Sequence, residues 1–240
     1  MAGWNKAARA EGLASAGPLF FGRSACPLGV AAKQNLGLTG IPLTGVEIVL
    51  LIKKRVNPMS VRYYPNYQKI LEAIIYVAQK AAGNDFHHIL KVLFYADKLH
   101  LQRFARPVLG DSYIKMSAGP VGSFAYDLLK MNDFLPGEIL QDVSESISVN
   151  IEKKAPRVST KRDPDLTYFS GSDLKCLDEA ISLCIGKSFS DLCDLTHQEK
   201  SWSEANINSE MDYENFIDDE TPNREELIAH IKATSHTLVL

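Results

Sequence analysis

The sequence predicts an α+β fold that is mainly helical, with a small antiparallel sheet or hairpin. Two observations support this prediction. Apolar residues recur every three to four positions through several long stretches of the chain, which is typical of amphipathic helices. Two short stretches instead alternate apolar and polar residues, at 113–116 and 147–151, which is typical of strands. Helices therefore supply most of the expected core.

The first two expected helices are separated by a single break. Residues 66–82 carry apolar positions at helical spacing and end at Gly83, a residue that commonly terminates helices. The second helix follows at once, with Asn84 as its expected N-cap and Asp85 near its positive end. It continues to about Ala105, where Arg106-Pro107 stops it.

The second helix places ionisable side chains on its apolar face. Asp97 is spaced to lie on this face, and His100 follows it by three residues, close enough for the two side chains to touch. The apolar members of the face are Phe86, Leu90, Leu93, Phe94, Leu101 and Phe104.

A strand and a third helix are expected next. Tyr113 and Lys115 alternate with Ile114 and Met116, and Pro120 suits the first position of a helix. Residues 119–122 then form a tight strand-to-helix turn; a phosphate-binding loop is disfavoured because Pro120 has no N–H to offer. The expected inward face of this helix is Val121, Phe124, Ala125, Leu128 and Leu129.

The remaining elements are a connector and several helices. Residues 144–158 begin as a strand and become a basic loop, with the pattern of a hairpin arm. Ser170 and Asp173 are spaced like a cap pair at the start of a helix closed by Gly186. Two short helices follow, the second opened by a capping box of Thr196 and Glu199, and a last helix starts at Thr221.

Composition favours a packed globular protein in a reducing compartment. Hydrophobic residues make up 45% of the 240 and charged residues 23%. The cysteines show no close paired spacing, and the start lacks the order of a secretory signal, so we expect a cytoplasmic protein without a membrane segment. The four are Cys26, Cys176, Cys184 and Cys193, of which Cys176 and Cys184 are expected in the core.

Charge is distributed unevenly along the chain. Residues 190–226 carry twelve acidic and two basic side chains, whereas residues 1–58 carry two acidic and seven basic ones. Binding to nucleic-acid phosphates needs clustered Lys and Arg, so the acidic C-terminal third makes nucleic acid an unlikely partner of this chain alone. The same segment suits a basic protein partner.

Asp97 and His100 admit two interpretations. The favoured one is a structural ion pair, in which Asp97 meets a basic group, with Arg106 expected first and Arg103 or Lys115 as alternatives. The other is an acid/base couple working with His197, although no nucleophile elbow accompanies it.

No metal or cofactor is predicted. The histidines 87, 88, 100 and 197 and Cys193 lack the spacing of a zinc site. Trp202 is expected in the core or a groove, and an exposed position would make it an interface anchor.

The ordered set of motifs resembles one family. In the first half these are Tyr95-Ala96-Asp97, His100-Leu101, Arg106-Pro107, Gly110-Asp111, Tyr113, Gly119-Pro120-Val121 and Tyr126-Asp127-Leu128-Leu129. In the second half they are Asp173-Leu174, Leu177-Asp178, Ser190-Asp191-Leu192, Leu195-Thr196-His197 and Trp202. From about Tyr67 to Phe216 the sequence resembles the Panacea domain, formerly a domain of unknown function, known from the SocA antitoxin and phage-associated proteins.

The resemblance implies a helical Panacea-type domain without enzymatic activity. Its implied function is that of an antitoxin, which neutralises a cognate protein toxin by direct binding. One alternative is a proteolysis adaptor that delivers a client toxin to a protease; the other is a small hydrolase or transferase using Asp97 and His100. The signature residues expected to bind a partner or to hold the fold are Tyr95, Asp97, His100, Arg106, Asp111, Tyr113, Gly119, Pro120, Tyr126, His197 and Trp202.

The N-terminal region differs in character from the rest. We expect an extension over residues 1–58 and the Panacea domain over 59–235. Eight of the fifteen glycines lie in the extension, and its apolar run Val46–Ile52 suits a strand or buried patch. Because helical patterning begins just after Met59, we expect translation to start there. Intact-mass measurement of the natively expressed protein checks this, and a mass that includes residues 1–58 contradicts it.

Overall fold

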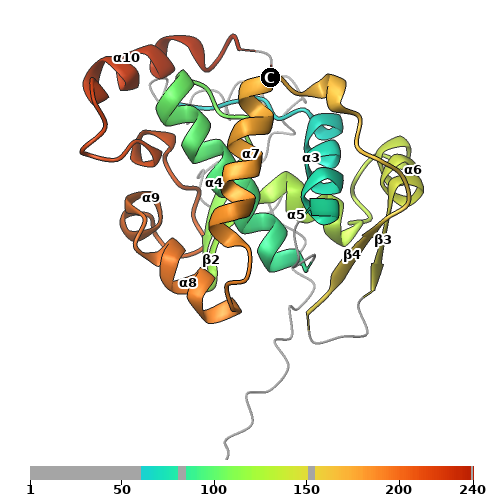
Figure 1. The fold of residues 1–240 in the computed structure, drawn as a ribbon. Coiled ribbons are helices and arrows are strands. Elements are labelled where there is room, and N and C mark those ends of the chain that lie inside the picture. The colour runs from blue at the N-terminus through green and yellow to red at the C-terminus, as the bar shows by residue number, and fades with distance from the viewer. Residues whose placement is uncertain (1–60, 81–84, 151–154, 239) are drawn as a thin grey trace, which may run out of the picture. The chain divides into compact units, whose positions relative to one another are not determined.

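The structure is a computed structural model that describes residues 61–80, 85–150, 155–238 and 240 (Figure 1). The chain divides into two units, Met1–Arg55 and Val56–Leu240, and the described residues all lie in the second. The expectations for the extension, Gly83, Asn84 and Cys26 fall outside the described residues.

The described part is mainly helical, and the predicted α+β class with small antiparallel sheets is confirmed (Figure 1). Its α-helices are α3 (Tyr67–Lys80), α4 (Phe86–Phe104), α5 (Ser123–Lys130), α6 (Gly137–Ser146), α7 (Gly171–Cys184), α8 (Phe189–His197), α9 (Lys200–Glu204) and α10 (Arg224–Thr234). Strands β1 (Tyr113–Met116) and β2 (Gly119–Gly122) form one antiparallel pair, and β3 (Ile147–Asn150) and β4 (Arg157–Thr160) form another. Short 3-10 helices are η1 (Leu166–Tyr168) and η2 (Tyr213–Phe216).

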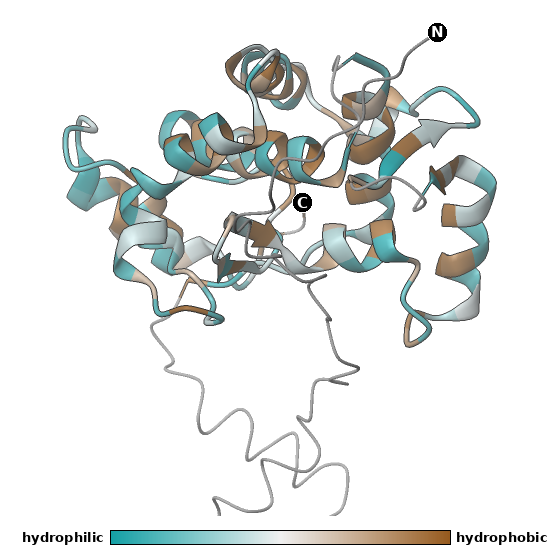
Figure 2. Cartoon of the chain, turned by 90° about the horizontal axis from the view of Figure 1, so that it is seen from below, coloured by the Kyte–Doolittle hydropathy of each residue, from teal (hydrophilic) through white to brown (hydrophobic). Residues whose placement is uncertain are grey.

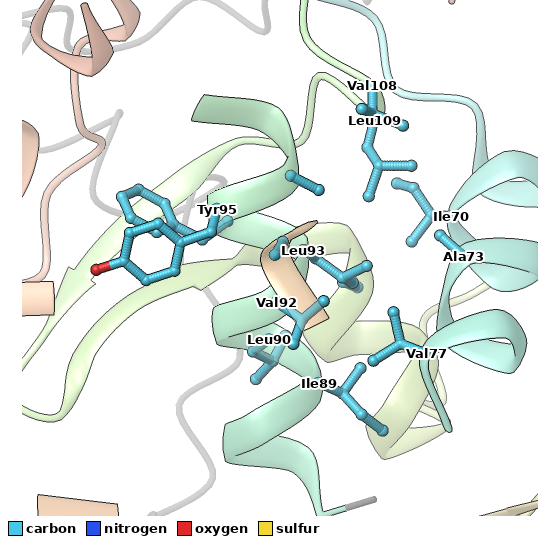
Figure 3. Packing of buried hydrophobic residues seen from close by; sticks show 14 of the residues in the cluster. Ile70, Ala73, Val77, Ile89, Leu90, Val92, Leu93, Tyr95, Val108 and Leu109 are labelled. Atoms are coloured by element: carbon cyan, nitrogen blue, oxygen red, sulfur yellow. The ribbon is translucent and has the colours of Figure 1, made fainter. Parts of the chain in front are cut away.

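Helix α4 forms the centre of the described unit. It runs antiparallel beside α7 and also packs against α3, α8 and β2 (Figure 1). Figure 3 shows the α3 side of the core, where apolar side chains of α3 meet those of α4 and of the turn that follows α4. The labelled members include Ile70, Ala73, Val77, Ile89, Leu93, Val108 and Leu109. Neighbours on several sides explain why nearly every residue from Ile89 to Leu101 is buried.

Helix α4 begins and ends differently from the prediction. Asp85, rather than Asn84, is the N-cap, because its Oδ1 accepts the backbone N–H of His88 at 3.0 Å. At the other end Ala105 adopts a left-handed conformation with φ 57° and turns the chain out of the helix. Phe104 therefore lies at the rim, 48% exposed, and its predicted place on the buried face is wrong.

The segment after α4 forms a strand pair. Strand β1 is where the alternation predicts it, but Pro120 lies in β2 opposite Lys115, not in a helix. The Pro120 carbonyl accepts a hydrogen bond from Lys91 Nζ of α4 at 2.7 Å, and this contact holds β2 against the core. Helix α5 therefore begins only at Ser123. The later start also exposes Phe124, which we expected to face inward.

The later helices keep most of their predicted positions. Strands β3 and β4 form the expected hairpin, although Arg157–Thr160 is a strand where a loop was expected. Ser170 and Asp173 form the predicted capping box of α7. The box expected at Thr196 is wrong: Thr196 lies inside α8 and donates its hydroxyl to the Leu192 carbonyl at 2.9 Å. A box of Ser188 and Asp191 opens α8 instead, and α10 begins at Arg224, later than predicted.

Figure 2 shows that the helices carry both hydrophobic and hydrophilic faces, as a core packed from amphipathic helices requires. Among the described helices, none combines enough length with enough hydrophobicity to traverse a lipid bilayer.

Gly119 and Gly186 both have positive φ, but only Gly119 has close neighbours. Substituting each by alanine therefore distinguishes the cost of backbone strain from the cost of steric crowding. Gly119 has φ 99°, and a Cβ there would lie 2.4 Å from Thr196 Oγ1 and 2.9 Å from Lys91 Cε. Gly186 has φ 75° and open space around it. Gly119→Ala should lower the free energy of unfolding by about 2–4 kcal/mol, the sum of backbone strain and overpacking. Gly186→Ala should cost only about 1 kcal/mol. Urea denaturation measures both, and equal losses would contradict the crowding at Gly119.

Candidate functional site

The Asp97 carboxylate joins α4 to the turn that follows it. It is fully buried and accepts the backbone N–H groups of Leu109 at 2.7 Å and Gly110 at 3.0 Å. The Tyr113 hydroxyl of β1 donates to the same carboxylate at 3.0 Å. The expectation that Arg106 is its partner is wrong, since backbone donors of the turn fill the position where a basic side chain was expected.

Arg106 and His100 instead belong to a second buried carboxylate, Asp173 of α7. Arg106 Nη2 lies 2.9 Å from Asp173 Oδ1, and His100 Nε2 lies 3.1 Å from the same oxygen. His100 Nδ1 lies 2.7 Å from the Arg106 carbonyl oxygen, so acceptors face both ring nitrogens. Lys69 of α3 completes the set with Nζ 3.2 Å from Asp173 Oδ2. His100 thus joins α4 to α7 and does not pair with Asp97.

A third buried carboxylate, Asp111, caps α5 from outside the helix. Its two oxygens accept the backbone N–H groups of Phe124 and Ala125, each at 2.9 Å. The N-cap residue Gly122 has no side chain to do this, and its missing Cβ leaves room: a Cβ there would lie 2.6 Å from Asp111 Oδ2. The negative charge also lies at the positive end of the helix dipole.

Burial and hydrogen bonding set the protonation of these carboxyls. Burial raises the pKa of Asp97 to about 6, although hydrogen bonds from the Leu109 and Gly110 backbone and from Tyr113 oppose the shift. Burial raises the pKa of Asp111 to about 7, against hydrogen bonds from the α5 backbone. Burial also acts on Asp173, but the His100 and Ser170 hydrogen bonds and nearby cations outweigh it and hold its pKa well below the usual range.

The tyrosines of the signature occupy different environments. Tyr95 is buried beside Phe94, with ring centroids 5.1 Å apart, and burial raises its pKa. Tyr126 is half-buried on α5, with Lys130 Nζ 5.8 Å from its ring centroid. Tyr213 of η2 donates its hydroxyl to the Asp111 carbonyl at 2.7 Å.

His197 and Trp202 form a separate stacked pair. Their ring centroids lie 3.7 Å apart with planes at 12°, and Lys115 Nζ lies 4.1 Å from the indole ring centroid. The indole Nε1–H donates to the Met116 carbonyl at 3.1 Å. Trp202 is half-buried and anchors α9 to β1, as a groove aromatic would. Within the described residues no hydrogen bond, ion pair or ring contact joins His197 to Asp97 or His100, so the three groups of the acid/base hypothesis do not converge.

Buried lysines were missed by sequence reasoning. Lys91 is 1% exposed, and burial lowers the pKa of its amine to about 7. Lys98, also buried, contacts Glu199 of the α8–α9 connection and lies 2.9 Å from Asp218. Their burial could have been predicted from the sequence, because both lysines lie within the long apolar run of α4, where a charged side chain needs a specific partner.

The described residues contain no group of three or more His, Cys, Asp or Glu side chains placed to hold a metal ion. Among the surface cavities lined by described residues, one lies near the start of α4 and another between α3, α6 and Arg162; Asp97 and His100 line neither of these. Cys176 and Cys184 are buried, as predicted for core residues.

The buried carboxyls predict an unusual pH dependence. A group whose pKa is raised on folding stabilises the fold below its unfolded pKa near 4, and this contribution is lost as pH rises through the folded value. For Asp97 the loss between pH 4 and 7 should be on the order of 2 kcal/mol. Asp97→Asn removes this titration, so the difference in unfolding free energy between wild type and variant should shrink as pH rises.

Urea denaturation at a series of pH values measures this difference. Asp178→Asn is the matched control, because Asp178 is exposed, pairs with Lys80 at 2.8 Å, and has a lowered pKa that places its titration below the window. Parallel stability curves for wild type and Asp97→Asn would contradict the assignment.

Comparison with known proteins finds one similarity. Residues 89–203 match the family model described as the antitoxin SocA-like Panacea domain. No curated protein and no solved structure gives a significant match. The matched range includes the buried carboxylates Asp97, Asp111 and Asp173 and the segments that supply most of their partners. Residues 89–203 are therefore similar to the antitoxin SocA-like Panacea domain.

Proposed function

We propose that this protein is a cytoplasmic antitoxin that neutralises a cognate protein toxin by direct binding. The match of residues 89–203 to the antitoxin SocA-like Panacea domain carries the proposal. This range holds most of α4, both strands of the first sheet and the helices up to α9. The proposed toxin-binding module is thus the folded centre of the described unit.

The contacts of the signature residues support binding rather than catalysis. Asp97, Asp111 and Asp173 are each at most 1% exposed, and their oxygens already accept hydrogen bonds from within the chain. General acid or base catalysis needs a group that can reach substrate. We therefore propose that these residues hold a binding scaffold, and that the chain is not an enzyme.

The acidic C-terminal segment supports a basic partner. Some of its carboxylates pair internally, as Glu214 does with Lys232 at 2.8 Å. Others are exposed on α8, α9 and α10 and the connections between them: Asp191, Asp194, Glu204, Asp212, Glu220, Glu225 and Glu226. Such a surface raises the rate at which a basic toxin is encountered and selects among partners, more than it adds final affinity.

Co-expression tests the proposal. The gene next to the one for this protein, expressed alone from an inducible promoter, should arrest growth, and co-expression of the full chain should restore it. A frameshifted copy of the chain is the control for expression load. A neighbour without toxicity, or toxicity unchanged by the full chain, would contradict the antitoxin function.

Charge variants refine this test. Asp194→Asn, Glu204→Gln and Asp212→Asn together should slow toxin association roughly three- to tenfold at low salt. Asp133→Asn, Glu138→Gln and Glu145→Gln remove the same charge from exposed positions around α6 and should leave the rate unchanged. A toxin whose half-life falls when the chain is present would instead identify a proteolysis adaptor.

A further inference from the structure

One corner of the described unit exposes apolar side chains, one of which lines a cavity. Leu183 at the end of α7, Ile185 in the following turn and Phe189 at the start of α8 are 37%, 46% and 59% exposed. Phe189 also forms a wall of a cavity of about 240 Å³. The other walls are Asp85, Phe86, His87, His88, Ala155 and Pro156, so three separate parts of the chain enclose it. We call this surface the α8 corner.

Hydrogen bonds between these three parts hold the cavity open in one shape. The backbone N–H of Phe86 donates to the Pro156 carbonyl at 3.1 Å, which joins α4 to the β4 side. His88 Nε2 lies 2.9 Å from the Lys187 carbonyl, which joins α4 to the turn before α8. A preformed cavity avoids the ordering cost that a partner would otherwise meet on binding.

Most polar groups in the walls are already used within the chain, whereas His87 Nδ1 is buried without a hydrogen-bond partner among the described residues. His88 Nδ1 lies 2.7 Å from Asp85 Oδ2, and His87 Nε2 lies 3.2 Å from the Ala118 carbonyl. The His87 ring lies against Phe189 with centroids 4.2 Å apart. Burial lowers the pKa of His87 to about 4, so the His87 ring is uncharged at neutral pH. The cavity therefore presents mainly hydrophobic surface to an occupant.

The volume of the cavity suits a single side chain better than a small molecule or cofactor. Sites for small molecules and cofactors usually measure roughly 300–1,000 Å³, which exceeds the 240 Å³ found here. Protein interfaces, by comparison, commonly bury one large aromatic or aliphatic side chain in a pocket ringed by weaker contacts. The exposed Leu183 and Ile185 supply apolar surface for such a ring.

The charged residues around the α8 corner indicate which residues a partner would carry on either side of the inserted side chain. From the end of α7 through α9, Asp191, Asp194 and Glu204 are exposed, whereas Lys187 is half-buried and Lys200 pairs with Asp219. On the β4 side of the cavity the exposed charge is basic, because Arg157 follows the lining residue Pro156. The surface that leads away from the cavity along α8 is therefore acidic. It complements lysine or arginine on either side of an inserted apolar residue.

We propose that the α8 corner is the anchor site for the partner protein. The cavity takes one aromatic or branched aliphatic side chain of the partner, and Asp191, Asp194 and Glu204 contact basic residues flanking it. This inference rests on the proposed function, because it names the surface with which the antitoxin would hold its toxin.

Short peptides test the site without knowledge of the toxin. NMR spectra of the full chain are recorded with three acetylated pentapeptides: Lys-Lys-Phe-Lys-Lys, Lys-Lys-Ala-Lys-Lys and Glu-Glu-Phe-Glu-Glu. The first should shift the side-chain signals of Phe189 and His87 in a saturable manner. Its affinity should exceed that of each of the other two at least fivefold. Phe189→Ala should abolish the shift of the His87 signals, whereas Phe134→Ala, at a position 72% exposed outside the corner, should leave the shifts at both residues unchanged.

Several results would overturn the proposal. Equal binding of the three peptides would exclude both the pocket and the charge selection. Shifts at Phe189 that appear only after deletion of residues 1–58 would make a segment of this chain the occupant. A dimer in size-exclusion chromatography that Phe189→Ala dissociates would make a second copy the occupant.

Toxin neutralisation then separates this inference from the proposed function. If co-expression shows neutralisation, Phe189→Ala should reduce it at least tenfold, and Phe134→Ala should not. Full neutralisation by Phe189→Ala would overturn the α8 corner while the antitoxin function stands. Absence of a toxin would defeat the proposed function and leave the peptide result to decide the corner. Unchanged thermal unfolding of both variants confirms that neither acts through misfolding.

Discussion

The buried Asp97 carboxylate is the constraint on which the rest of the fold depends. An isolated charge in a protein interior is costly, so this carboxylate persists only because donors surround it. The donors come from the turn at Leu109 and Gly110 and from Tyr113 of β1. Tyr213 of η2 approaches the same group at 3.5 Å. One side chain of α4 thereby determines where the turn, the first sheet and the C-terminal segment lie.

Two further carboxylates repeat this arrangement at other junctions. Asp111 fixes the start of α5, and Asp173 binds α7 to α3 and α4 through cations and an imidazole. Leaving any of their donors without an acceptor would cost about 1–3 kcal/mol, so each junction has one favourable geometry. Apolar packing holds the helices together, and the carboxylates fix their register. This division explains why much of the family signature is polar and buried.

Sequence patterns predicted most of the elements, although helix α6 was missed, and predicted their polar contacts poorly. The capping box of Ser170 and Asp173 was predictable, because both partners lie within four residues. The partners of Asp97 were not predictable, since they are backbone N–H groups, which every residue except proline carries. Phe104 is exposed because the chain leaves the helix at Ala105, which has a left-handed conformation. Alanine rarely adopts this conformation, so the sequence did not predict it. The buried Lys91 depends on the Pro120 carbonyl, 29 residues away, so only the fold reveals its partner.

The contact between Tyr213 and Asp111 spans 102 residues of sequence. During synthesis α4 and the first sheet leave the ribosome well before η2. The polar contacts around Asp97 and Asp111 therefore lack the Tyr213 hydroxyl until η2 has been made. Domains gain their final packing only when such distant segments arrive. A newly made chain therefore completes these contacts late, and the interval between synthesis and full assembly depends on translation speed through the acidic segment.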